Sequence, residues 1–159
     1  MHPQLAHVLS FLTETAWKLP DERDYWHQKG LLGTPEFFTL KDLKAYVNGP
    51  MLMPEYFALV YQGKKIDCTQ AIAHKVVQRA QIRFLNKGVL EDYLSRGAAL
   101  VAEGLDIAFP QINEFCAAID EASPCVLSNP VAFFSQRGAE AYRGHLDSDD
   151  VLVVQLAGQ

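Results

Sequence analysis

Residues 142–158 read YRGHLDSDDVLVVQLAG. This stretch joins a His-x-Asp motif, His145 and Asp147, to an apolar run over Val151–Leu156. Such a run predicts a strand buried on both faces, and residues two apart in a strand point to the same side. His145 and Asp147 would then offer an imidazole nitrogen and a carboxylate oxygen to one metal ion. They supply two of the three protein ligands of a 2-His-1-carboxylate site, the arrangement typical of non-haem Fe(II).

Gln155 is the polar residue inside the apolar run. If the alternation holds, its side chain lies on the same side as His145 and Asp147. A polar group in a buried strand needs a partner, and a metal cavity would provide one. The motif alone is equally consistent with a polar turn before a strand. No histidine follows His145 in the sequence, so the chain shows half of a metal site.

Length and composition predict one domain with a substantial core, because the chain has 159 residues of which 49% are hydrophobic. A net charge of −5 argues against nucleic-acid binding, which usually requires a basic face. The sequence has no apolar window of about twenty residues, so we expect no membrane span. The stretch before Pro20 lacks the basic start of a signal peptide.

Three cysteines, Cys68, Cys116 and Cys125, have no Cys-x-x-Cys spacing. We interpret them as reduced thiols of a cytoplasmic protein. Each is expected to pack as a small buried hydrophobe rather than to act as a nucleophile or ligand.

Periodicity and capping signals predict an α+β domain over residues 1–159, with a helical lead-in over 1–50 and a core of strands and helices over 51–159. Helices are expected over Leu5–Trp17, from a capping box at Thr39–Asp42 through about Val47, over Thr69–Gln81, over Leu90–Ser95 and from Pro110 onward. Strands are expected over Tyr56–Tyr61, near Ile66 after a turn at Gln62–Lys65, over Ala98–Ala102, and over Cys125–Phe134 with an interruption at Asn129-Pro130.

Five blocks of the sequence match motifs of one family. They are YWHQKGLL at Tyr25–Leu32, FTLKDL at Phe38–Leu43, GAALV at Gly97–Val101, the stretch Asn129–Ser135, and Gly144–Gly158. The last block resembles H-x-D-x-x-D-V-hydrophobic-x-Q-x-x-G, with one additional residue before Gln155. Together they resemble the JmjC-like cupin oxygenases, especially the branch of ribosomal-protein hydroxylases. Gly30 stands where that family usually has proline.

The resemblance implies N-terminal helices packed on a double-stranded β-helix (a cupin or jelly-roll fold) that holds Fe(II) and 2-oxoglutarate. His145 and Asp147 match the first two iron ligands, and Asn129 and Gln155 are candidates for binding the cofactor. The family's second ligand histidine and its basic anchor for 2-oxoglutarate lie beyond the part matched by Gly158. We therefore expect an incomplete β-helix and interpret the chain as the N-terminal part of a longer protein. A natural half-domain completed by another chain is the alternative.

The resemblance implies an Fe(II)- and 2-oxoglutarate-dependent dioxygenase that hydroxylates a protein side chain. A non-catalytic cupin-like module for binding or assembly, and a tailoring hydroxylase for small molecules, are the alternatives. Expected partners are a protein or small-molecule substrate, with neither nucleic acid nor membrane. We also expect a homo-oligomer, because an apolar strand over Val151–Leu156 at an open sheet edge invites pairing.

Overall fold

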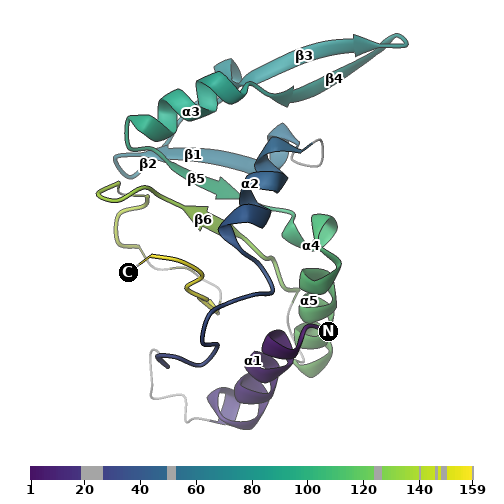
Figure 1. Cartoon of the computed structure of the whole chain (residues 1–159), viewed down its shortest axis with the longest axis vertical. Coiled ribbons are helices and arrows are strands. Elements are labelled where there is room, and N and C mark those ends of the chain that lie inside the picture. The colour runs from purple at the N-terminus through teal and green to yellow at the C-terminus, as the bar shows by residue number, and fades with distance from the viewer. Residues whose placement is uncertain are drawn as a thin grey trace.

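The computed structural model describes residues 1–18, 27–49, 53–123, 127–139, 141–145, 147 and 150–158. These residues form helices and two antiparallel sheets, so the predicted α+β class is confirmed. One sheet has four strands in the order β2-β1-β5-β6, and the other is the β3–β4 hairpin (Figure 1). Within the described residues neither sheet closes into a barrel. Tyr25, Trp26, Pro50 and Cys125 lie outside them.

The four-stranded sheet consists of β1 (Phe57–Tyr61), β2 (Lys64–Lys65), β5 (Ala99–Ala102) and β6 (Ala132–Phe134). Its register pairs Leu59 with Leu100 and Leu100 with Phe134, so these three residues share one face. That face packs on the main core, to which all three side chains belong. The opposite face carries a small second cluster of Ala58, Val60 and Val101. Strands predicted near Tyr56–Tyr61 and Ala98–Ala102 are thus confirmed.

Helices complete the main core. They are α1 (Pro3–Glu14), α2 (Leu40–Asn48), α3 (Lys87–Ser95), α4 (Leu105–Ala108) and α5 (Pro110–Ala122), with short 3₁₀ turns η1 (Ala16–Lys18), η2 (Pro54–Tyr56) and η3 (Thr69–Ala71). The first helix packs against α5, each through an apolar stripe at helical spacing: Leu5, Val8 and Leu12 on α1, and Ile112, Phe115 and Cys116 on α5. Among the described residues, no helix has the length and apolar character needed to span a membrane.

Two local signals place α2. The predicted capping box is present: the Thr39 hydroxyl accepts a hydrogen bond from the Asp42 amide, and the Asp42 carboxylate accepts one from the Thr39 amide. From the other end of the helix, the Tyr46 hydroxyl donates to the Glu103 carbonyl at 2.7 Å. This bond ties α2 to the end of β5, and burial raises the pKa of the Tyr46 phenol.

The helix predicted over Thr69–Gln81 is wrong. This region forms η3 and then the hairpin of β3 (Ile72–Val77) and β4 (Ala80–Leu85). Gln78 and Arg79 form its turn with φ of 47° and 72°. A two-residue hairpin turn of type I′ has both central residues in this left-handed region. Because neither residue is glycine or asparagine, the usual sequence signal for a hairpin is missing.

Three further strand predictions differ from the structure. The turn after β1 is tighter than expected, so β2 begins at Lys64 and ends before Ile66. In the stretch predicted over Cys125–Phe134, the described part from 127 on is a strand only at β6. The described residues 150–158 form no strand, because no neighbouring strand pairs with them, and Val151 and Val153 are 62% and 79% exposed. The expected buried strand at Val151–Leu156 is therefore wrong.

Candidate metal site

His145 and Asp147 lie side by side, as the motif predicts. Nε2 of His145 is 3.2 Å from Oδ1 of Asp147, and both side chains are about half exposed. Residues 141–145 and 147 form no strand, so the chain brings the two side chains together through a loop rather than through strand alternation. The pair is open to a metal ion or another ligand from solvent.

A hydrogen bond on the other side of the imidazole orients the ring. Nδ1 of His145 lies 2.9 Å from the backbone carbonyl oxygen of Arg143. A carbonyl oxygen accepts hydrogen bonds, so Nδ1 carries a proton and donates it. In the neutral ring Nε2 then has a free lone pair, which faces the Asp147 carboxylate. Both groups are electron-rich, and each is attracted to a proton or a metal cation that lies between them.

Aromatic contacts connect this pair to the sheet. The Tyr142 ring meets the His145 ring edge to face, with centroids 5.6 Å apart. The same tyrosine makes a second edge-to-face contact with Phe133 of β6 at 6.4 Å. Such contacts favour one ring orientation over others. The edge strand therefore positions His145 through Tyr142.

The β1–β2 turn contacts the residues that precede His145. Gly63 has a φ of 75°, and a Cβ atom at this position would lie 2.7 Å from Cγ of Arg143. Glycine is thus required both by the turn and by the passing side chain. Arg143 in turn provides the carbonyl that accepts the proton of His145 Nδ1.

The His145–Asp147 geometry fits two positions on one metal ion. Ligand atoms about 2.1 Å from an ion in neighbouring octahedral positions are about 3 Å apart, close to the observed 3.2 Å. No group of three His, Cys, Asp or Glu side chains suited to a metal occurs in the described part of the chain. His2 caps α1 and His74 contacts Gln81. The described residues therefore fit two of the three ligand positions of a facial triad.

The two candidate cofactor residues do not join this pair. Asn129 is exposed in the segment before β6. Gln155 is also exposed, and its side-chain amide donates to the carbonyl of Ala157. Its partner is thus local backbone, because the buried strand that was expected to hold it does not form. Of the aromatic neighbours, Phe134 packs on the core, whereas Phe133 contacts Tyr142.

The described cysteines have the properties of packing residues. Burial raises the pKa of the Cys116 thiol to about 11 and shifts that of Cys68 upward. Both are free thiols, and at neutral pH both are protonated. Cys125 lies outside the described residues.

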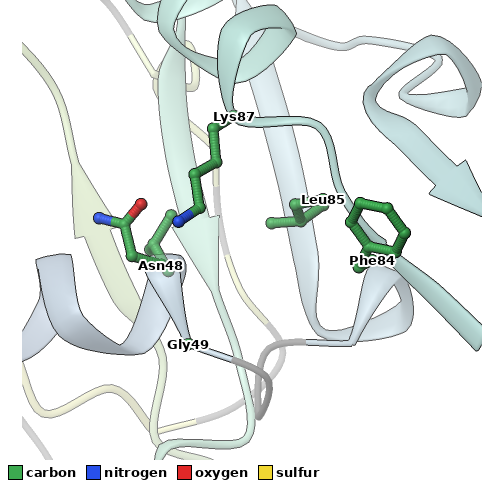
Figure 2. A pocket seen from close by; sticks show the side chains of 6 residues that line it. Asn48, Gly49, Phe84, Leu85 and Lys87 are labelled. Carbon is green, nitrogen blue, oxygen red and sulfur yellow. The ribbon is translucent and has the colours of Figure 1, made fainter. Parts of the chain in front are cut away.

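Two surface hollows lie away from the candidate metal site. One, of about 320 Å³, is lined by Val47, Asn48, Gly49, Phe84, Leu85 and Lys87, between the end of α2 and the base of the hairpin. Figure 2 shows the Lys87 side chain pointing toward Asn48, with Leu85 and Phe84 on the other side. The second, of about 400 Å³, is lined by residues of α4 and α5. Neither shares a residue with the His145–Asp147 pair.

The chain matches no protein-family model, no curated protein and no solved structure with which it was compared.

Proposed function

We propose that this chain carries the His-Asp half of the iron site of an Fe(II)- and 2-oxoglutarate-dependent hydroxylase. The observation behind the proposal is the arrangement of His145. Its Nδ1 donates to the Arg143 carbonyl at 2.9 Å, and its Nε2 lies 3.2 Å from the Asp147 carboxylate. Metal-binding histidines commonly donate their second ring nitrogen to a carbonyl or carboxylate in this way.

In this proposal His145 Nε2 and Asp147 Oδ1 hold the metal, and a further ligand comes from outside the described residues. Bound iron would supply the oxidising power for inserting oxygen into a C–H bond, with 2-oxoglutarate as co-substrate. The chain's own contribution is orientation. Arg143 fixes the proton on Nδ1, and Tyr142 fixes the plane of the ring.

Anaerobic Fe(II) titration by calorimetry, with and without 2-oxoglutarate, tests the proposal. We expect binding that H145A and D147A each weaken at least tenfold, the range seen when a metal site loses a group that supports it. D150A and H74A are matched controls, since both residues are exposed and lie outside the pair. Equal Fe(II) affinity in H145A, D147A and the unmodified chain would show that the pair is not a metal site.

A non-catalytic binding or assembly module is the second candidate. It is favoured by the two-ligand count within the described residues and by the half-exposed pair. Such a module would bind Fe(II) without any change on adding 2-oxoglutarate. Affinity that rises with 2-oxoglutarate favours the hydroxylase.

We further propose a protein side chain as the substrate and a reducing, cytoplasmic compartment as the location. Support for the compartment comes from the free thiols of Cys68 and Cys116. To distinguish a protein hydroxylase from a tailoring enzyme, a peptide library and a set of small-molecule candidates are each incubated with Fe(II), 2-oxoglutarate and oxygen. Mass spectrometry then shows which of the two pools contains products heavier by 16 Da per inserted oxygen.

A further inference from the structure

The β3–β4 hairpin exposes an apolar face. Cross-strand partners share a face, so the register places Ala73, Lys75, Val77, Ala80, Ile82 and Phe84 together. Val77, Ile82 and Phe84 are 40%, 48% and 43% exposed. A two-stranded hairpin is marginally stable in water unless a third strand or another element covers it. This face therefore favours a further partner.

The hairpin also has an open edge. Within the described residues β3 pairs with β4 alone. Arg83 of β4 forms an ion pair with Glu55 of η2, which ties β4 to the body of the molecule. In Figure 1, β4 lies on the side of the hairpin that faces α2 and β3 lies on the outer side. The backbone groups along the outer edge of β3 are thus available to another strand.

The hairpin carries a charge opposite to the net charge of the chain. Residues 64–87 contain six Lys and Arg but a single acidic residue, and Lys75, Arg79 and Arg83 of these lie on the hairpin, whereas the whole chain has a net charge of −5. Two hairpins that met each other would bring like charges together. The hairpin therefore favours an acidic partner that also carries apolar side chains.

A segment with these properties exists in the same chain. Asp150 precedes Val151, Leu152 and Val153, which are 62%, 46% and 79% exposed, and three aspartates lie within residues 147–150. The segment is rich in β-branched residues, which favour strands. It nevertheless forms no strand within the described part of the chain. It has strand-forming side chains without a sheet edge, and the hairpin has a sheet edge without a strand.

We propose that residues 150–153 of a second copy of this chain add as a third strand beside β3. Figure 1 shows the C-terminal segment below the four-stranded sheet and the hairpin projecting beyond α3, so the same copy's segment does not lie at its own hairpin. In the added strand Asp150 and Leu152 lie on the face of Lys75 and Ile82, so that Leu152 extends the apolar face and the Asp150 carboxylate lies on the same side as the Lys75 ammonium. Exchange in both directions closes a two-fold dimer. The interface requires no metal.

Sedimentation velocity of the unmodified chain across a concentration series is the test. We expect a monomer–dimer equilibrium that weakens as salt is raised, because screening reduces the attraction between opposite charges. K75E and D150K should each weaken dimerisation about tenfold, and the K75E/D150K pair should recover most of it. K41E is the matched control, since Lys41 lies exposed on α2.

A second pair of variants tests the apolar face without changing charge. I82T replaces a residue of the docking face, and I107T replaces a more exposed isoleucine of α4, outside the hairpin. We expect I82T to weaken the dimer and I107T to leave it unchanged, with circular dichroism showing both folded. A monomer at all concentrations, or a dimer that is equally stable in I82T, I107T, K75E and the unmodified chain, would overturn the proposal. The proposal would also be overturned if the chain stayed monomeric and bound a single-stranded 20-nucleotide DNA through Lys75, because the hairpin would then be a nucleic-acid-binding surface.

Discussion

The side chain of Arg143 passes directly over Gly63, so that a Cβ atom on Gly63 would lie 2.7 Å from Cγ of Arg143. The contact joins the β1–β2 turn to the loop that carries the His145–Asp147 pair. The same arginine holds His145 through its carbonyl oxygen. A glycine 82 residues earlier in the sequence therefore takes part in placing the candidate metal ligand.

We expect G63A to destabilise the protein by about 1–2 kcal/mol, because alanine at a φ of 75° is strained. The new methyl group would also push Arg143 away and weaken the metal binding that we propose for His145. Thermal unfolding and Fe(II) titration measure the two effects. G88A in α3 is the control: its Cβ would meet Asn86 at an ordinary 3.6 Å, and a helical alanine is more stable than glycine by about 0.5–1 kcal/mol. Unchanged metal affinity in G63A would show that the β1–β2 turn does not position the His145–Asp147 pair.

L5A should destabilise the protein by about 2–5 kcal/mol, since it leaves a cavity where α1 packs on the core. Leu5 is 1% exposed. L127A removes the same atoms from a side chain that is 92% exposed, and we expect it to change stability by about 0.5 kcal/mol or less. Urea unfolding of the two variants compares them directly. Similar midpoints for both would contradict the packing of α1 against α5.

Y46F removes the hydroxyl that donates to the Glu103 carbonyl, and it should cost about 1 kcal/mol. Y61F serves as its control, because Tyr61 is 40% exposed and its hydroxyl makes no hydrogen bond with the described residues. The difference between the two variants in thermal unfolding gives the contribution of the bond. If they unfold alike, the bond between α2 and the end of β5 does not contribute to stability.

The pKa of Cys116, raised to about 11 by burial, predicts a pH dependence. The folded protein favours the protonated thiol, so this contribution to stability is complete below the unfolded thiol's pKa of about 8.5 and is lost as the pH rises through 11. We expect iodoacetamide to alkylate Cys116 slowly at pH 8 in the folded chain and quickly in urea, as followed by peptide mass spectrometry. Equal rates in the two states at pH 8 would show that the thiol is accessible.

Elements with strong local signals were predictable from the sequence. The capping box at Thr39 marks the start of α2, and Pro110 marks the start of α5, because both act on backbone groups within one turn of the helix. The strand around Leu59 was predictable because its neighbours form an apolar run. The prediction of a helix over Thr69–Gln81 was wrong because Gln78 and Arg79 form a hairpin turn without glycine or asparagine, the residues that usually indicate such a turn.

The candidate site was likewise predictable only in part. The sequence by itself determined the α+β class, most helices and the presence of His145 and Asp147 two residues apart, because propensity, capping and spacing act over a few neighbouring residues. Tertiary structure decided that Gly63 and Phe133 position the loop of that pair, and that Val151 is exposed rather than buried. These outcomes depend on which distant segments come into contact, and local patterns carry no information about such contacts.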